Sequence, residues 1–328
     1  MNEGTAYITT QNLAIGYTLG KSQNRLFENL NLSVYGGQMT CFMGPNGAGK
    51  SSLLRTLARL QQPLDGRIQY HASGETDKPE HQIAVVLTDR VSAANLTVDE
   101  VVSFGRYPYL GWNIQLHNRD KEIIQEAIHS VRIESLLGRR LHELSDGQVQ
   151  MVMIARALAQ DTPIILLDEP TAHLDLNNRV EIMNLLRQLS RSTGKAILLA
   201  THELDLALQT ADLIWLTGNN QDILSGMPED LVLSGAFDEI FRFKGFDLKT
   251  GKVIHQPFRN TTINLDGEGA IYLWTKNALE RNGFSVSRTE HAHILITLVG
   301  ESAQPGWIIN KNDSVTHVDS LEKLINSL

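Results

Sequence analysis

The chain has 328 residues, and its 29 lysines and arginines against 37 aspartates and glutamates give a formal net charge of -8. This length allows one large domain plus a small one, and the acidic balance without a basic cluster argues against a nucleic-acid partner. The first residues do not resemble a signal peptide and no apolar run is long enough to span a bilayer, so a cytoplasmic protein is expected. The single cysteine, Cys41, is expected to pack in a strand and cannot form an intramolecular disulfide.

The first part of the chain predicts two sheets. Residues 6–40 alternate short β-like runs with Gly and Asn turns, which favours an antiparallel sheet with Leu30–Val34 as one of its strands. From Met39 onward, compact apolar runs alternate with helical segments, as in a parallel sheet covered on both faces. The strands expected there are Met39–Met43, Ile164–Leu167 and Ala196–Ala200. Helical periodicity between Leu96 and Gln160 predicts a helical subdomain that interrupts this sheet.

The tail predicts a separate module. We place a boundary near residue 247, so that residues 1–247 form the first domain and residues 248–328 a small C-terminal β/α module. His291 and His293 would project to one face of a strand, a spacing compatible with a metal, although histidines on a solvated strand face are commoner. A regulatory or dimer-stabilising role for the module is a hypothesis, which deletion at residue 247 would test.

A glycine-rich motif follows the strand that ends at Met43. The segment Gly44-Pro-Asn-Gly-Ala-Gly-Lys50-Ser51 matches G-x-x-x-x-G-K-[ST], in which backbone N–H groups surround phosphates, the lysine reaches the outer phosphates and the hydroxyl binds Mg²⁺. A strand before the motif and a helix after it argue against a glycine-rich turn without a ligand. The residues expected to bind nucleotide here are Gly44, Pro45, Asn46, Gly47, Ala48, Gly49, Lys50, Ser51 and Ser52.

Two carboxylates follow the apolar run that begins at Ile164. Asp168 suits the Mg²⁺ shell that neutralises the β- and γ-phosphates, and Glu169 suits the orientation or deprotonation of the attacking water. His202 follows the next apolar run, so it is expected at the same sheet edge, where an imidazole can hydrogen-bond the γ-phosphate. Together with Lys50, Glu169 and His202 are the candidate catalytic residues. A solvated Asp-Glu pair and a lone surface histidine are the alternative interpretations.

The segment Leu144-Ser-Asp-Gly-Gln148 precedes a helical run, with Ser145 and Asp146 as N-cap candidates. A helix N-terminus offers free N–H groups and a positive dipole end to an anion. In isolation, plain helix capping is the better explanation of this pentapeptide, and an anion at Ser145, Gly147 and Gln148 is the alternative.

In this order, the motifs make the chain similar to the nucleotide-binding subunit of an ATP-binding cassette (ABC) transporter, over roughly Tyr7 to Ile240. The resemblance implies an α/β P-loop NTPase fold of the ABC ATPase type, with a mixed-sheet core, an antiparallel β subdomain and a helical subdomain. It also implies ATP and Mg²⁺ as cofactors, and a homodimer in which Ser145 and Gly147 contact the γ-phosphate bound by the opposite subunit. Ala172-His-Leu-Asp175 matches the family's D-loop, and Tyr17 lies where the family places an aromatic residue on adenine.

The segment Phe104-Gly-Arg106-Tyr-Pro108-Tyr109 is similar to the G-R-x-P segment of ATPases that power import of iron-siderophore, haem and cobalamin. That resemblance implies a homodimeric ATPase at the inner face of the cell membrane, beneath two transmembrane permease subunits that an extracytoplasmic binding protein supplies. The alternative for this segment is an exposed arginine beside a proline-induced turn.

Three positions depart from the family pattern. Asp89 stands where the family has its Q-loop glutamine, and because a carboxylate accepts but does not donate hydrogen bonds, Asp89 is a candidate Mg²⁺ contact. Asp146 replaces a glycine of the signature, and Val149 replaces the usual basic residue after it. Two other functions stay open: an ABC-superfamily ATPase for another task, such as DNA repair or ribosome work, and a nucleotide-binding regulator without transport.

Overall fold

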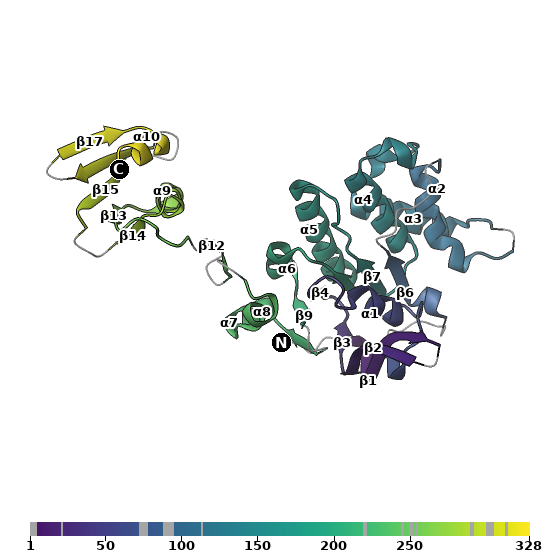
Figure 1. The fold of residues 1–328 in the computed structure, drawn as a ribbon. Helices are drawn as coiled ribbons and strands as arrows, with labels where there is room; N and C mark the ends of the chain where they lie inside the picture. The colour runs from purple at the N-terminus through teal and green to yellow at the C-terminus, as the bar shows by residue number, and fades with distance from the viewer. Residues whose placement is uncertain are drawn as a thin grey trace. The chain divides into compact units, whose positions relative to one another are not determined.

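The computed structural model describes residues 5–20, 22–71, 78–87, 95–112, 114–218, 222–243, 246–248, 252–253, 255–288, 292–299, 305–311 and 314–328. Contacts divide the chain between Arg242 and Phe243 into two compact units (Figure 1), and each is described by itself. The domain ranges 1–247 and 248–328 stay a prediction. The second unit begins with two short antiparallel strands, β11 (Phe246–Asp247) and β12 (Lys252–Val253), close to the predicted boundary at residue 247.

An antiparallel sheet opens the first unit, as the turn-rich pattern of residues 6–40 predicted. Its long strand β1 (Ala6–Leu19) pairs with every other described strand of this sheet. These partners are β2 (Ser22–Leu30), β3 (Ser33–Tyr35) and β5 (Asp65–Tyr70). The prediction of one strand over Leu30–Val34 was wrong, because the ladder breaks at Asn31 and Leu32, between β2 and β3. There the amide of Asn12 donates to Asn31 Oδ1 and the amide of Leu32 donates to Thr10 Oγ1, so side chains take the place of backbone partners.

A second sheet joins six of the described strands in the order β10-β9-β4-β8-β7-β6. Its strands are β4 (Met39–Met43), β6 (Ile83–Val86), β7 (Ile164–Asp168), β8 (Ala196–Ala200), β9 (Leu213–Thr217) and β10 (Ile223–Gly226). All pair in parallel except β10, which is antiparallel to β9. The buried, apolar character of β4, β7 and β8 is what a sheet covered on both faces requires.

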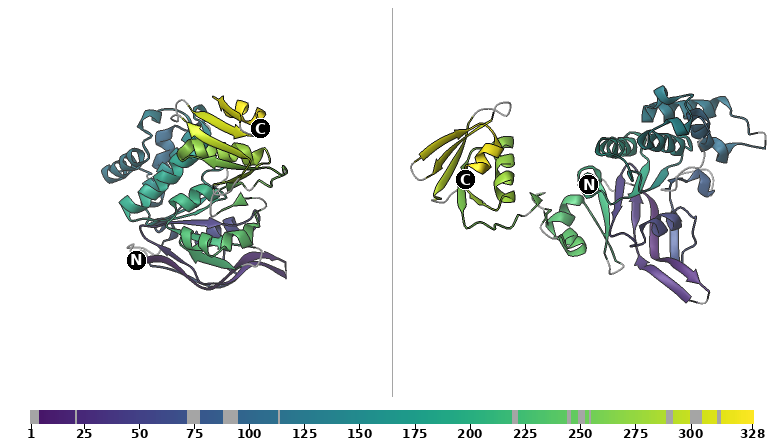
Figure 2. Two further views of the ribbon diagram at one scale, coloured as in Figure 1. Left: turned by 90° about the vertical axis from the view of Figure 1, so that its left-hand side faces the viewer. Right: turned by 45° about the horizontal axis from the view of Figure 1, so that its top comes forward.

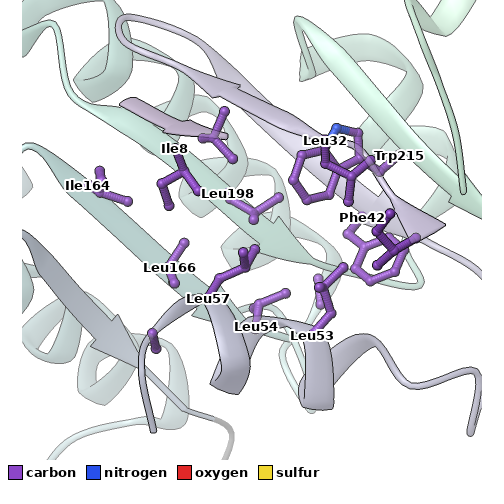
Figure 3. Close-up of a cluster of buried hydrophobic side chains, with 14 of the residues drawn as sticks. Ile8, Leu32, Phe42, Leu53, Leu54, Leu57, Ile164, Leu166, Leu198 and Trp215 are labelled. Atoms are coloured by element: carbon purple, nitrogen blue, oxygen red, sulfur yellow. The ribbon is translucent and has the colours of Figure 1, made fainter. Parts of the chain in front are cut away.

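Helix α1 (Lys50–Leu57) packs its buried leucines between the two sheets, in a cluster that contains Phe42 of β4 and Trp215 of β9 (Figure 3). Helices α5 (Leu176–Thr193) and α6 (Leu204–Thr210) also contact the six-stranded sheet, at β4 and β8. This packing holds the segment before α1 and the ends of β7 and β8 in a rigid frame.

The expected helical subdomain lies between β6 and β7. It consists of α2 (Val98–Ser103), α3 (Asn118–Val131) and α4 (Asp146–Ala159), with short 3₁₀ turns at Phe104–Tyr109, Glu134–Leu136 and Leu141–Glu143. The 3₁₀ turn at Pro79–His81 precedes β6, and α7 (Pro228–Leu233) and α8 (Ala236–Phe241) end the unit. In the part of the chain that the structure describes, every helix is too short or too polar to cross a membrane.

The second unit has a five-stranded sheet in the order β14-β13-β15-β16-β17. Its elements are β13 (Thr262–Asp266), α9 (Gly269–Arg281), β14 (Ser285–Ser287), β15 (Ile294–Val299), β16 (Gly306–Lys311), β17 (Ser314–Val318) and α10 (Leu321–Asn326). Side chains of α9 and α10 share one core with the sheet, so both helices cover the same face (Figure 2). His293 is exposed, as the commoner of the two alternatives has it, but it precedes β15 and does not lie in a strand as predicted; His291 lies outside the described residues.

Candidate nucleotide-binding site

The P-loop, residues 44–51, joins β4 to α1. Gly47 and Gly49 have left-handed φ values of 79° and 94°, which glycine adopts without the steric cost of a Cβ. A Cβ on Gly49 would also come within 2.9 Å of the Phe27 ring. Gly49 is the N-cap of α1 and no side chain caps that helix, so the positive end of its dipole can receive an anion.

Lys50 is buried at the start of α1. Its Nζ donates one hydrogen bond of 2.8 Å to the carbonyl oxygen of Gly44 and one of 3.0 Å to the carbonyl oxygen of Pro45. Burial lowers the pKa of Lys50, and the nearby carboxylates of Glu169 and Asp168 oppose that shift only in part. The loop therefore holds a cation whose desolvation a phosphate group could compensate.

The hydroxyl of Ser51 and the carboxylate of Asp168 meet beside the P-loop. Ser51 Oγ donates to Asp168 Oδ1 over 3.0 Å, and Asp168 is buried at the end of β7. Hydroxyl and carboxylate oxygens are the ligands that Mg²⁺ prefers, and Mg²⁺ is commonly held by one or two such groups together with substrate phosphates. These two residues therefore fit a magnesium ion. The prediction for Asp89 falls outside the described residues.

Glu169 and His202 also lie at this edge. Strands β7 and β8 are parallel neighbours with Asp168 opposite Ala200, so the residues that follow each strand lie close together. His202 Nδ1 is 3.2 Å from Glu169 Oε2, and Glu169 has a left-handed φ of 48°. Such a backbone conformation is costly for a residue with a Cβ and is typical of functional sites.

Tyr17 reaches the same site from the antiparallel sheet. It lies in β1, the residue is 46% exposed, and its hydroxyl is 2.5 Å from Ser52 Oγ in the first turn of α1. The structure thus brings an aromatic face to the P-loop. Asn46 and Ala48 lie in the loop itself, where the amide of Ala48 bonds the carbonyl of Pro45.

The signature residues form the start of α4. Ser145 is the N-cap: its Oγ accepts from the amide of Gln148, and the Gln148 side chain accepts from the amide of Ser145. A Cβ on Gly147 would come within 2.8 Å of the Asn178 side chain in α5. Within the described ranges, no hydrogen bond or ion pair joins Ser145, Gly147 or Gln148 to Lys50 of the same chain.

One neighbour of His202 and its partner were missed by sequence reasoning. Glu203 Oε1 lies 3.4 Å from His202 Nε2 and 2.7 Å from Nη1 of Arg179, which is located in α5. No spacing rule pairs a strand-end acid with a helix residue so far away in sequence. Only the position of Glu203 directly after His202 could have indicated the contact.

Arg106 of the G-R-x-P segment is buried, so the alternative of an exposed arginine is wrong. Its Nε donates to Asp120 Oδ1 over 2.9 Å, its Nη1 donates to the carbonyl of Ala159 over 3.1 Å, and its guanidinium carbon lies 4.0 Å from the centre of the Tyr109 ring. The arginine thus fastens the 3₁₀ turn at Phe104–Tyr109 to α3 and to the end of α4.

Comparison with known proteins places these features in a family. Residues 27–172 match the ABC transporter family model, and residues 260–328 match the model described as the iron ABC transporter C-terminal domain. A petrobactin import ATP-binding protein of Bacillus anthracis is 38% identical over 231 residues, which cover 69% of this chain and 85% of that protein. The ferric enterobactin transport ATP-binding protein of Escherichia coli K12 is 33% identical over 248 residues, which cover 74% of this chain and 89% of that protein.

Among solved structures, a dimeric post-hydrolysis state of an ATP-binding cassette bound to ADP and Pi is similar with a TM-score of 0.55 and 26% identity, covering 67% of this chain and 98% of that one. The ordered motifs, the cassette fold and these relatives agree with one another. The chain therefore belongs to the ATP-binding proteins of ABC transporters, and it binds and hydrolyses ATP.

Proposed function

We propose that this chain is the ATP-hydrolysing subunit of an importer that takes up iron bound to siderophores. The observation that carries the cargo class is the match of residues 260–328 to an iron transporter domain, beside relatives named for petrobactin and ferric enterobactin. The match extends the resemblance that the G-R-x-P segment indicated, and it favours iron-siderophore over haem or cobalamin.

The contacts of the site support the following chemistry. Lys50 would bind the outer phosphates, and Mg²⁺ held by Ser51 and Asp168 would neutralise their charge. Glu169 would orient or deprotonate the attacking water, and His202, 3.2 Å away from it, would hydrogen-bond the γ-phosphate. Each role follows from a side chain that the fold brings to one edge of the sheet.

A homodimer would complete this site. The N-terminus of α4, with Ser145, Gly147 and Gln148, is oriented by capping bonds and, among the described residues, makes no hydrogen bond to Lys50 of its own subunit; we infer that it contacts the γ-phosphate bound by the opposite subunit. Tyr17, a residue that is about half exposed, would stack on adenine. Dimeric cassettes among the similar solved structures support this arrangement.

The transmembrane permease subunits would bind a surface with exposed apolar side chains. Tyr107, Trp112 and Ile114 follow the buried Arg106 and are all exposed, and Trp112 is completely so. Nearby, a pocket of about 380 Å³ is lined by residues that include Leu60, Phe104 and Arg156. Exposed apolar clusters of this kind are typical of interaction sites. Bound there, the chain would be peripheral at the cytoplasmic face of the membrane, and an extracytoplasmic protein would deliver the cargo.

Uptake by cells tests the proposal. In a strain that lacks this gene, the wild-type gene is expected to restore uptake of radioactive iron bound to siderophores, and the Glu169→Gln gene is not. Haem and cobalamin uptake are measured in the same strains as matched cargoes. If the strain without this gene loses haem or cobalamin uptake but keeps the uptake of siderophore-bound iron, the proposed cargo class is contradicted. The assignment as an ATPase would still hold.

A further inference from the structure

Arg179 lies in the first turn of α5 and makes contacts in two directions. Its Nε donates a hydrogen bond to the carbonyl oxygen of Leu174 in the D-loop, and its Nη1 donates to Glu203 Oε1, both over 2.7 Å. The side chains of Arg179 and Glu203 are 34% and 16% exposed. Two short bonds from one planar group, at a partly buried site, fix both the D-loop carbonyl and the carboxylate of Glu203.

Glu203 is shared between Arg179 and the switch histidine. His202 Nε2 lies 3.4 Å from Glu203 Oε1, while His202 Nδ1 lies 3.2 Å from Glu169 Oε2. The imidazole thus sits between two carboxylates that compete for it. Because Arg179 neutralises Glu203, it weakens the attraction of Glu203 for the imidazole and leaves His202 available to Glu169 and to a phosphate beside it.

The turn that carries Arg179 is itself fixed. Asp175 is the N-cap of α5, and its carboxylate accepts from the backbone amide of Asn178 over 2.9 Å and from the Asn178 side chain over 3.0 Å. That same Asn178 side chain lies against Gly147, where a Cβ would come within 2.8 Å of it. The first turn of α5 therefore has few ways to move without moving the signature helix α4.

We propose that Arg179 is a positioning residue for ATP hydrolysis: it holds Glu203 so that His202 faces Glu169 and the γ-phosphate. Arg179 touches neither nucleotide nor water, and it acts through His202. The inference rests on the role proposed above for His202 at the ATP site. It adds a link from the D-loop carbonyl of Leu174 to that histidine, through one guanidinium group.

Steady-state ATPase kinetics of the full chain test this role. Arg179→Gln is expected to lower kcat about tenfold and to change the KM for ATP less than about twofold, because Arg179 does not touch the nucleotide and its loss affects only the position of His202 during hydrolysis. Arg179→Lys keeps a cation for Glu203 and is expected to recover part of kcat. Arg191→Gln is the matched control. Arg191 lies on the same helix, and its Nη2 is 3.0 Å from Asp212 Oδ1, in an ion pair that does not involve the site. The Arg191→Gln protein is expected to hydrolyse ATP at the wild-type rate.

The decisive comparison is made in a His202→Ala background. If Arg179 acts through His202, Arg179→Gln lowers kcat no further there, whereas an equal tenfold loss in both backgrounds would overturn the inference. Wild-type kcat in Arg179→Gln, or the same loss in Arg191→Gln, would also overturn it. If Arg179→Gln does not fold, Arg179→Lys is measured in both backgrounds with the same criterion. A wild-type rate for His202→Ala alone would instead refute the role of the histidine and, with it, this inference, while siderophore uptake tests the transport proposal separately.

Discussion

Ser51 Oγ donates a hydrogen bond to Asp168 Oδ1 over 3.0 Å, which connects the first turn of α1 to the end of β7. The contact joins the phosphate-binding motif to the acidic strand end and brings a hydroxyl and a carboxylate together, where both could hold a cation. It explains why a hydroxyl residue and a carboxylate so far apart in sequence belong to one magnesium site.

Substitution of Asp168 by Asn should remove most of this site's affinity for Mg²⁺. The amide keeps the size of the side chain but removes its charge, so we expect the ATPase rate to fall at least about a hundredfold and its Mg²⁺ requirement to rise. Titration of the rate with MgCl₂ measures both effects, with Ser51→Ala as a milder companion. An Asp168→Asn protein with the wild-type Mg²⁺ profile would exclude Asp168 as a metal ligand.

Substitution of Glu169 by Gln should separate ATP binding from hydrolysis. The amide cannot accept a proton from water, so we expect turnover to fall by about a hundredfold or more with ATP binding retained. The protein should then persist as a dimer in ATP, which light scattering after gel filtration can measure. Hydrolysis at the wild-type rate would contradict the role of Glu169.

The positions of the polar residues at the strand ends could be predicted from the sequence, because local patterns determine where each strand ends. The run Ile164–Leu167 is apolar at every position, which identified a buried strand, and a parallel sheet brings the ends of such strands to one edge. The same reasoning placed His202 after β8 beside Glu169. Ser145 as N-cap of α4 followed from capping chemistry alone.

Contacts that depend on packing between distant elements could not be found in this way. The bonds of Arg106 to Asp120 and of Arg179 to Glu203 join a turn or helix to an element whose position only the folded core determines. The break between β2 and β3 also escaped the pattern, because it depends on hydrogen bonds of the Asn31 and Thr10 side chains to backbone amides. Hydrophobic periodicity carries no information about such pairs.

The pH dependence of folding should report the buried state of Lys50. Burial lowers its pKa below the usual 10.5, so between the two values the unfolded chain binds more protons and stability rises with pH. We expect the unfolding free energy of the nucleotide-free wild type, relative to Lys50→Met, to be larger near pH 10.5, the usual pKa of a lysine, than at neutral pH. Urea unfolding at both pH values measures it. A constant or falling difference would show that Lys50 is not desolvated.

The ion pair of Arg106 and Asp120 should contribute to stability because it is buried. Burial alone would raise the pKa of Asp120, but hydrogen bonds from the His117 amide and from Arg106 outweigh it, and the net shift is downward. Removal of the arginine in Arg106→Met leaves the buried carboxylate of Asp120 without its cation and should lower the free energy of unfolding by about 3 kcal/mol at neutral pH.

The matched variant of this pair is Arg106→Met combined with Asp120→Asn. This double variant also removes the unpaired negative charge of Asp120, so it should lose less stability than Arg106→Met alone. In the wild type, the contribution of Asp120 is present above its usual pKa of 3.8 and is lost as pH falls through the lower folded value, whereas acid should unfold Arg106→Met at a higher pH. Circular dichroism across urea and pH titrations measures both. Equal stability of the wild type and Arg106→Met would refute the contribution.

Cys41 should report the opening of the cassette, because it is the only cysteine and lies fully buried in β4. Burial, with a smaller effect of Asp212, raises the pKa of its thiol, so the reactive thiolate is scarce in the folded state. Alkylation of the native protein should be at least about a hundredfold slower than after denaturation, and ATP should slow it further because ligand binding favours the closed state. Lys50→Met is the control, since ATP should not protect a protein that cannot bind it. Rapid alkylation of a fully active protein would show that β4 opens without unfolding of the cassette.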